Sequence, residues 1–429
     1  MNPGSRTCRS VLTSALALIA ASTLLAGCYV GTRSVDLWAL SAIFGIAAAA
    51  SPIRSVCLEV RQRRLLAQRI VILGSGPMAA KLLEEIRALD WCGHLVAGVI
   101  DDEPLPAAWA AQTTWLGPSG QLAEIVDRVR PSRIVVAVAD RRSRLPLQPL
   151  LESRVRGVIV EDAQEFYERL TGKIAIESLN PSALILSSKG FRNHGAAERI
   201  ARSASLIIAA LGLVLCAPLL AAIAAAIKLE SGGPVLFVQK RAGRNGQPFG
   251  LLKFRTMHPS DQRSSEWVRD NVDRITRLGG WLRRFRLDEL PQLVNVLKGE
   301  MNLVGPRPHP TSNHQTFTER IAYYPIRLTV RPGVTGWAQV RYGYANDLEE
   351  ETEKMRYDLF YIKNRSLRLD ARILLETIFV ILSGDGASRA RRHVPTPANL
   401  AWSPVRAAKP SYSSLLVARR TARSPAGRR

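Results

Sequence analysis

The feature that most constrains the fold is an uncharged, apolar stretch from Ser203 to Ile227, long enough to cross the hydrocarbon core of a bilayer. Pro218 lies near its middle, and a proline inside a helix removes a backbone hydrogen bond and predicts a kink. Positive charge flanks both ends, at Arg202 and Lys228. Two interpretations stay open for residues 203–227: a re-entrant membrane helix with both ends on one side, and a proline-containing helix that spans the bilayer.

Two further apolar segments, Val11–Val30 and Leu37–Ile53, each approach the length of a membrane span. The sequence Leu25-Ala26-Gly27-Cys28 also resembles the end of a lipoprotein signal peptide, but that interpretation would export the whole chain, away from the ligands that its later motifs predict. We therefore expect residues 1–60 to form a transmembrane hairpin. Basic residues follow it between positions 61 and 69, so the positive-inside rule places the next part of the chain in the cytoplasm.

Residues 61–178 have the pattern of a soluble, Rossmann-like α/β domain. A strand over residues 69–73 leads into Gly74-Ser75-Gly76-Pro77-Met78-Ala79, a G-x-G-x-x-A turn that opens a helix, and further strands are expected at 95–100 and 133–139. Asp101 and Asp102 follow the second strand, where a carboxylate could bind a ribose. Pro77 weakens that interpretation, so nucleotide binding and a structural or regulatory role both stay open. Residues 179–202 are expected to be a linker.

Charge and cysteine content limit the partners of this chain. The formal net charge is +23, and residues 387–429 hold ten Lys and Arg with no Asp or Glu, which predicts a disordered basic tail over 386–429. Such a tail is attracted to anionic lipid headgroups, and no zinc-finger spacing or RNA-binding aromatic pattern supports nucleic acid as a partner. The five cysteines show no paired spacing, which is typical of a reducing compartment.

The motifs with the most chemical content fall in residues 228–385, above all in the run LDELPQLVNVLKGEMNLVGPRP over 287–308. Asp288 and Glu289 place two carboxylates side by side, a pattern that suits attack on a phosphoryl centre and the binding of a divalent metal. We expect residues 281–297 to be helical, with a new helix beginning near Pro291 so that its first amides help to bind a phosphate.

Basic residues in stiff or glycine-rich segments surround this pair in the sequence. The Val304–Pro308 turn presents Arg307, whose guanidinium can bind phosphate with two parallel hydrogen bonds. Arg331-Pro332-Gly333 likewise presents an arginine in a stiff segment with proline and glycine. A glycine-rich stretch ends in Lys253-Phe254-Arg255-Thr256-Met257, which also suits a phosphate-bearing ligand.

Together these motifs resemble the bacterial sugar transferase family, the polyprenyl-phosphate phosphoglycosyl transferases of the single-membrane-helix type. The resemblance covers about residues 199–383 and is carried by the Pro218 helix, Gly233-Pro234 to Gln239, Lys253 to Met257, Leu287 to Gln292, Val304 to Pro308 and Arg331 to Val340. Arg286-Leu287-Asp288 and Arg341-Tyr342 look closest to the exopolysaccharide subgroup linked to PEP-CTERM/exosortase systems. The resemblance implies an α/β membrane protein with a mainly helical α/β catalytic domain that follows the membrane helix.

The resemblance also implies a reaction and its residues. Asp288 would attack the β-phosphate of a UDP-sugar, and undecaprenyl phosphate would take the phosphosugar from the carboxylate. Glu289 would position the reaction or share a Mg²⁺ or Mn²⁺ ion with Asp288. Phosphate contacts are implied for five arginines: Arg255, Arg283, Arg307, Arg331 and Arg341. An inner-membrane enzyme with its catalytic domain in the cytoplasm is expected, in contact with membrane lipids and able to form homo-oligomers.

The sequence departs from the family pattern at two places, and two other functions stay open. Many relatives carry a small residue in place of Arg286, and some have Asn-Gly-Arg where this chain has Arg341-Tyr342-Gly343. One alternative is a membrane-anchored nucleotide-sugar oxidoreductase or dehydratase that uses the 74–79 loop, although Tyr167 has no Lys four residues on. The other is a membrane scaffold without catalytic activity.

Overall fold

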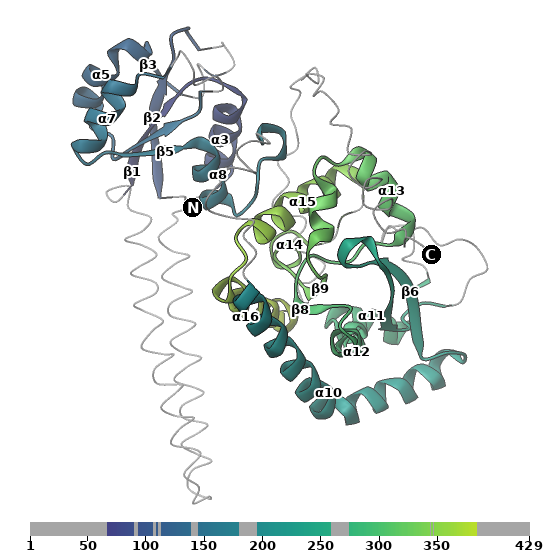
Figure 1. Cartoon of the computed structure of the whole chain (residues 1–429). Coiled ribbons are helices and arrows are strands. Elements are labelled where there is room, and N and C mark those ends of the chain that lie inside the picture. The colour runs from purple at the N-terminus through teal and green to yellow at the C-terminus, as the bar shows by residue number, and fades with distance from the viewer. Residues whose placement is uncertain are drawn as a thin grey trace, which may run out of the picture. The chain divides into compact units, whose positions relative to one another are not determined.

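The computed structural model describes residues 67–89, 93–105, 109, 113–138, 145–179, 195–258, 274–343, 345 and 347–383. The expected amino-terminal hairpin and the basic tail lie outside these residues. The described chain contains a parallel α/β domain, one long apolar helix and a mainly helical unit with short strands (Figure 1).

The first domain is built on a five-stranded parallel sheet in the order β3-β2-β1-β4-β5. Its strands are β1 (Gln68–Leu73), β2 (His94–Ile100), β3 (Trp115–Gly117), β4 (Arg133–Val136) and β5 (Ile159–Asp162). The chain moves outward from β1 to β3 and then returns to the other side of β1, so the strand order reverses between β1 and β4. Ligands bind at this kind of reversal in doubly wound sheets. The Rossmann-like prediction is confirmed.

Helices cover both faces of this sheet because side chains in β1 alternate between its faces. Ile70 and Ile72 pack against α3 and α8, and Val71 and Leu73 pack against α5 and α7. The helical elements are α3 (Pro77–Ala88), η2 (Ser119–Gln121), α5 (Leu122–Val129), α7 (Leu147–Val155), α8 (Ala163–Thr171) and η3 (Ile176–Ser178). The four side chains from Ile70 to Leu73 are buried, so the core of this domain lies on both sides of its central strand.

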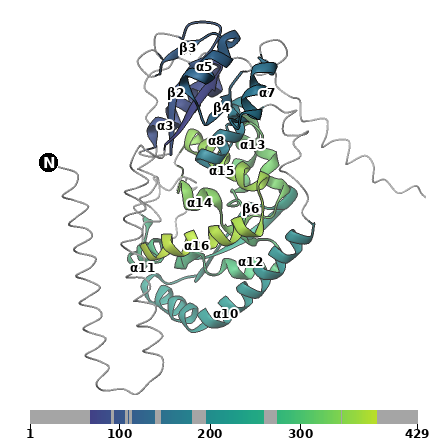
Figure 2. The same ribbon diagram turned by 90° about the vertical axis from the view of Figure 1, so that its left-hand side faces the viewer.

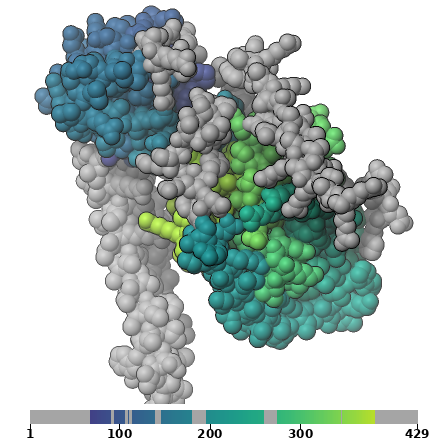
Figure 3. Space-filling model, viewed as in Figure 1, coloured from purple at the N-terminus to yellow at the C-terminus, as the bar shows by residue number. Residues whose placement is uncertain are grey.

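The long helix α10 (Gly195–Ser231) contains Pro218 and bends partway along its length (Figure 1). In the described part of the chain it is the one helix long and apolar enough to cross a membrane, as judged by its length and composition. Val214 and Leu215 are 77% and 81% exposed, so part of its apolar middle is not covered by the described residues. Figure 3 shows α10 in teal at the outer surface of the mainly helical unit. The helix extends beyond both ends of the predicted 203–227 segment, and its re-entrant path stays a prediction.

The mainly helical unit, residues 236–383, combines two small sheets with several helices. Strands β6 (Leu236–Ala242) and β7 (Pro248–Phe254) form an antiparallel hairpin around η4 (Arg244–Gly246), and β8 (Asn302–Val304) pairs in parallel with β9 (Gly333–Thr335). Its helical elements are α11 (Arg277–Arg284), η6 (Leu287–Glu289), α12 (Gln292–Lys298), α13 (Thr311–Arg320), η7 (Tyr324–Thr329), α14 (Trp337–Arg341), α15 (Leu348–Lys363) and α16 (Leu367–Ser383). Helix α16 contacts α10, α14 and β9 (Figure 2).

The expected helix over residues 281–297 is interrupted in the structure. Helix α11 ends at Arg284, and Arg286 adopts a left-handed conformation with φ 57°. This conformation is uncommon for a residue other than glycine and turns the chain sharply. The short η6 turn then carries both acids, and α12 begins at Gln292, directly after Pro291. The prediction of a new helix near Pro291 is therefore confirmed, whereas the prediction that the chain is helical from residue 281 up to that point is wrong.

Candidate active site

Asp288 and Glu289 lie in the η6 turn between α11 and α12, and both are buried, with 7% and 6% of their surfaces exposed. A buried carboxylate needs compensating charge or hydrogen bonds. For Glu289 the partner is Arg307, which donates from Nη1 to Oε2 at 3.2 Å and from Nη2 to Oε1 at 2.7 Å. Nη1 of Arg286 lies 3.6 Å from the same carboxylate. Both oxygens of Glu289 are thus engaged by a cation.

The surroundings of the Asp288 carboxylate differ from those of Glu289. Among the described residues, no hydrogen bond or ion pair closes on its carboxylate, although Lys253, Arg307 and Arg283 are near enough to act on its charge. Burial and the neighbouring Glu289 raise the pKa of Asp288, whereas the Arg307 guanidinium and Lys253 hold the pKa of Glu289 well below its usual range. Glu289 is therefore firmly ionised and tied, and Asp288 is the acid that is left to react.

Arg307 reaches the acids because of how its turn is built. Strand β8 ends at Val304, and Gly305-Pro306-Arg307-Pro308 follows it. A Cβ atom at Gly305 would lie 2.6 Å from the carbonyl oxygen of Arg331, so only glycine fits beside the neighbouring strand. The predicted stiff turn with one outward guanidinium is present, and its observed target is Glu289.

The structure brings only part of the predicted arginine set to the acids. Arg283 and Arg307 act on Asp288. Arg331 instead lies 3.6 Å from Glu198, and Arg341 donates to Glu376 at 2.8 Å. Phosphate contacts by Arg331 and Arg341 stay predictions.

Arg255 binds the carboxyl end of α10. It donates to Oγ of Ser231 at 2.9 Å and to the carbonyl of Gly232. It is 8% exposed, and its Nε and Nη1 atoms have no hydrogen-bond partner among the described residues. Unpaired buried donors are costly, so these two atoms keep the predicted phosphate contact open.

Lys253 was inside a predicted phosphate-binding segment but was not singled out by sequence. It precedes Arg255 at the end of β7 and lies close enough to the acids to affect both. Burial and the Arg307 guanidinium lower the pKa of Lys253 to about 7. Together with Arg283 and Arg307, it gives the pair of acids a cationic surrounding that suits a phosphate-bearing substrate.

A small cavity of about 120 Å³ opens beside the acids. Arg286 and Glu289 lie at its polar part, and the other lining residues are Leu290, Leu293, Val334, Thr335, Gln339, Val340, Thr377, Val380 and Ile381. Most of these side chains are apolar, and apart from Leu290, which follows η6, they come from α12, β9, α14 and α16. A ligand with an anionic head and an apolar tail would match this lining.

The pair of acids could take part in holding Mg²⁺, but not as a complete protein cage. Among the described residues, no group of three or more His, Cys, Asp and Glu side chains is arranged to hold a metal. Mg²⁺ often binds through one or two carboxylates together with substrate phosphates, and the untied Asp288 fits that pattern. Glu289 fits it less well, because Arg307 already donates to both of its oxygens.

The glycine turn of the Rossmann-like domain borders a second cavity of about 260 Å³. There the carboxylate of Asp101 accepts from the backbone N–H of Ser75, and Asp102 accepts from the N–H of Ser119 at 2.9 Å. One backbone amide of the glycine turn is thus bound by an acid of the same chain. Tyr167 does not line this cavity: it is fully buried and its hydroxyl donates to Glu85 at 3.2 Å.

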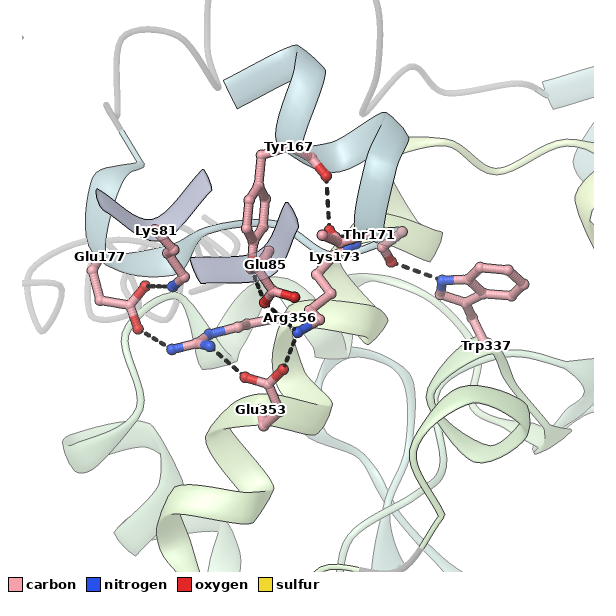
Figure 4. A network of polar contacts seen from close by, with 10 residues as sticks. Lys81, Glu85, Tyr167, Thr171, Lys173, Glu177, Trp337, Glu353 and Arg356 are labelled. Atoms are coloured by element: carbon pink, nitrogen blue, oxygen red, sulfur yellow. Dashed lines mark hydrogen bonds and ion pairs between the residues drawn. The ribbon is translucent and has the colours of Figure 1, made fainter. Parts of the chain in front are cut away.

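A polar network that sequence reasoning missed joins the Rossmann-like domain to α15 (Figure 4). It runs through Gly172–Leu179, which we call the strap. Nζ of Lys173 lies 2.7 Å from both Glu85 on α3 and Glu353 on α15. Arg356 pairs with Glu353 and with Glu177, and the backbone N–H of Ile174 donates to the carbonyl of Arg356 at 3.1 Å.

Apolar contacts and α14 reinforce the strap. Ile174, Ile176 and Leu179 pack in one buried cluster with side chains of α13 and α15. Nε1 of Trp337 donates to the carbonyl of Gly172 at 2.8 Å. The strap is more than 150 positions away in the sequence from the α14 and α15 residues that it contacts, so no local sequence pattern predicts the contact.

Comparisons with known proteins match two family profiles and several named relatives. The profile described as bacterial sugar transferase matches residues 196–384, and one described as CoA-binding domain matches residues 3–144. A UDP-glucose:undecaprenyl-phosphate glucose-1-phosphate transferase of Xanthomonas campestris pv. campestris is 32% identical over 367 residues, which make up 81% of this chain and 73% of that protein. The Escherichia coli protein of the same name is 31% identical over 72% of this chain and 67% of its own length.

A third relative is a UDP-N-acetylgalactosamine-undecaprenyl-phosphate N-acetylgalactosaminephosphotransferase of Aeromonas hydrophila. It is 41% identical over 227 residues, and this chain spans about half of its length, 52%. The chain belongs to the bacterial sugar transferase family.

Proposed function

We propose that this protein transfers a sugar-1-phosphate from a UDP-sugar to undecaprenyl phosphate, the step that begins an exopolysaccharide repeat unit. The observation that carries the proposal is the unequal state of the two acids. Arg307 ties Glu289, while Asp288 stays untied beside Lys253 and Arg283. The names of the relatives, which are transferases with UDP-sugar donors and undecaprenyl phosphate as acceptor, support the same reaction.

In the proposed mechanism, a carboxylate oxygen of Asp288 attacks the β-phosphorus of the UDP-sugar. The bond from that phosphorus to the bridging oxygen breaks, and UMP leaves with the electron pair. An oxygen of undecaprenyl phosphate then attacks the same phosphorus, and the Asp288–phosphorus bond breaks to release undecaprenyl-diphosphate-sugar. Covalent catalysis divides one hard displacement into two easier ones.

The neighbouring residues have separate tasks in this mechanism. Lys253, Arg283 and the guanidinium of Arg307 offset the charge of phosphates that approach the ionised acids. Glu289, held by Arg307, keeps the η6 turn in place. A bound Mg²⁺ or Mn²⁺ ion would neutralise phosphate charge and act as a Lewis acid. The apolar cavity beside Glu289 suits the first part of a polyprenyl chain.

The membrane setting belongs to the same proposal. We place the enzyme at the inner membrane with its catalytic unit in the cytoplasm, where UDP-sugars are made, and with α10 entering and leaving the bilayer on one side. The exposed apolar middle of α10 and the positive charges near its ends support this arrangement. Membership of the exopolysaccharide subgroup linked to PEP-CTERM/exosortase systems stays a prediction.

The test uses the full chain in nanodiscs with undecaprenyl phosphate, Mg²⁺ and a panel of labelled UDP-sugars. We expect UMP release and a lipid-linked label with at least one donor, and loss of both in Asp288→Asn. Without acceptor, the wild-type protein should retain label on the polypeptide and Asp288→Asn should not. Full activity in Asp288→Asn would refute the covalent mechanism, and a wild-type protein that transfers no label from any UDP-sugar would refute the function.

A further inference from the structure

Helix α15 carries charged side chains on two opposite faces. Glu353 and Arg356 meet the strap. Glu351, Lys354 and Asp358 follow the i, i+3, i+7 spacing of one helix face, and all three are buried. That second face lies against the segment that follows Arg307: Oε1 of Glu351 is 2.8 Å from Nε2 of His309.

The contact that matters most for the acids is made by Asp358. Its Oδ2 accepts from Nε of Arg327 at 2.8 Å, and the two side chains are 2% and 4% exposed. Nη2 of Arg327 donates onward to the backbone carbonyl of Arg307. A continuous series of hydrogen bonds therefore runs from α15 through Arg327 and the Arg307 backbone to the guanidinium that holds Glu289.

We propose that Arg327 and Asp358 are positioning residues for the transfer reaction, because they fix the backbone of Arg307 so that its guanidinium ties Glu289 and leaves Asp288 free. This inference rests on the proposed function. Neither residue touches a substrate. Both act through Arg307, and α15, braced on its other face by the strap, supplies their fixed support.

The turn needs such support because of its own sequence. Pro306 and Pro308 flank Arg307 and have no backbone N–H to donate, so the turn has fewer hydrogen bonds of its own. Its carbonyls are instead bound from outside the turn: Arg327 donates to that of Arg307, Nη1 of Arg241 to that of Pro308 at 3.1 Å, and the backbone N–H of Gly333 to that of Pro306 at 3.0 Å.

A buried ion pair adds little net stability compared with a well-packed apolar pair, so stability alone does not account for Arg327 and Asp358. A displacement of about 1 Å in a group that orients the reaction can lower the rate about 100-fold.

The test is a double-mutant cycle with Asp358→Asn and Arg307→Ala, measured as labelled phosphosugar transfer by the full chain in nanodiscs. We expect Asp358→Asn to lower kcat about 100-fold with little change in the donor KM. In the Arg307→Ala background, where there is no guanidinium left to position, the same substitution should change kcat by no more than about twofold. Equal losses in both backgrounds, or no loss in the first, would overturn the inference.

Two further variants separate positioning from folding. Arg327→Lys keeps a cation beside Asp358 but lacks the guanidinium fork that reaches Asp358 and the Arg307 carbonyl together, so it should also lower kcat. The matched control is Glu161→Gln, which breaks another largely buried pair, Arg133 with Glu161 at 2.6 Å, in the Rossmann-like sheet. It should lower the thermal midpoint and leave kcat unchanged. A wild-type protein without activity would refute the proposed function and this role with it, whereas an active wild type with an additive cycle would refute this role alone.

Discussion

The Lys173→Met substitution tests whether the polar network holds the strap on α15. The Lys173 ammonium lies between Glu85 and Glu353, at 2.7 Å from each, and its side chain is 10% exposed. Methionine has a similar length and no charge. The variant would therefore leave two partly buried carboxylates facing each other without the cation between them.

The magnitude follows from burial. Removing one partner of a buried ion pair costs about 3–5 kcal/mol, because the other partner stays charged and uncompensated. Glu353 keeps Arg356 and Glu85 keeps the hydroxyl of Tyr167, which places the expected loss near the lower end of that range. A loss of about 3 kcal/mol in the local opening free energy of the strap corresponds to a roughly 150-fold change in its opening equilibrium.

Hydrogen exchange at the backbone amide of Ile174 measures this equilibrium directly, because that amide donates to the carbonyl of Arg356 across the contact. We expect its exchange to speed up roughly 150-fold in Lys173→Met, in line with the opening free energy. Arg156→Gln is the control, because its partner Asp127 is well exposed and a surface pair contributes about 0–1 kcal/mol. Exchange at Ile174 should not change in that control.

A triple variant shows whether uncompensated charge is the cause. Combining Lys173→Met with Glu85→Gln and Glu353→Gln removes both carboxylates together with the ammonium. Replacing all partners of a buried polar contact is often nearly neutral, so Ile174 protection should largely return. Unchanged exchange in Lys173→Met would show that the apolar contacts of the strap and not its ion network hold it in place. Equally fast exchange in the single and the triple variant would show that uncompensated charge is not the cause.

Three other predictions concern α11, the pH response of the strap and the path of α10. Gly279→Ala should destabilise the protein by about 1–3 kcal/mol in thermal unfolding, because its Cβ would lie 2.2 Å from a backbone oxygen, while Gly280→Ala, with open space around it, should be neutral or stabilising. Burial raises the pKa of Glu177, but neighbouring cations outweigh it and lower that pKa to about 2. The stabilising contribution of Glu177 should therefore be complete above pH 4.5 and disappear as the pH falls toward 2. A comparison of the thermal midpoints of the wild type and Glu177→Gln across this pH range measures it. Single cysteines placed at Gly195 and at Ser231 in a cysteine-free chain should react with an impermeant reagent from the same side of the membrane if α10 is re-entrant, and from opposite sides if it spans.

Local patterns predicted the parts of this structure that depend on neighbouring residues. The apolar run over residues 69–73 and the glycine turn after it fold as a buried parallel strand and a helix start, because side-chain alternation and glycine geometry act over a few positions. The stiff turn around Arg307 was predicted for the same reason. The break between α11 and α12 was not, since nothing before Arg286 signals that a residue other than glycine will adopt a positive φ there.

The two arginine turns show why a repeated motif did not predict a repeated role. Arg307 and Arg331 both lie beside a proline and a glycine, and the sequence assigned both to phosphate. In the structure β8 and β9 pair in parallel, so that the backbone of Gly305 abuts that of Arg331 and Gly333. The turns therefore meet through their backbones, and their side chains reach different partners: Glu289 for Arg307 and Glu198 for Arg331.

The same reasoning explains why the sequence could find the pair of acids and assign their roles only by resemblance. Asp288 and Glu289 are adjacent and chemically alike, so any difference in reactivity has to come from residues that tertiary structure brings to one of them. Arg307 donates hydrogen bonds to the carboxylate of Glu289, and its backbone is held by Arg327 and Asp358, which lie 20 and 51 positions further along the chain. Because that support passes through α15, and the strap braces α15 from the Rossmann-like domain, changes at the strap have a physical route to the acids. If both proposals hold, Lys173→Met should lower kcat less than Asp358→Asn does, because it loosens the support of α15 without breaking the contact to Arg307.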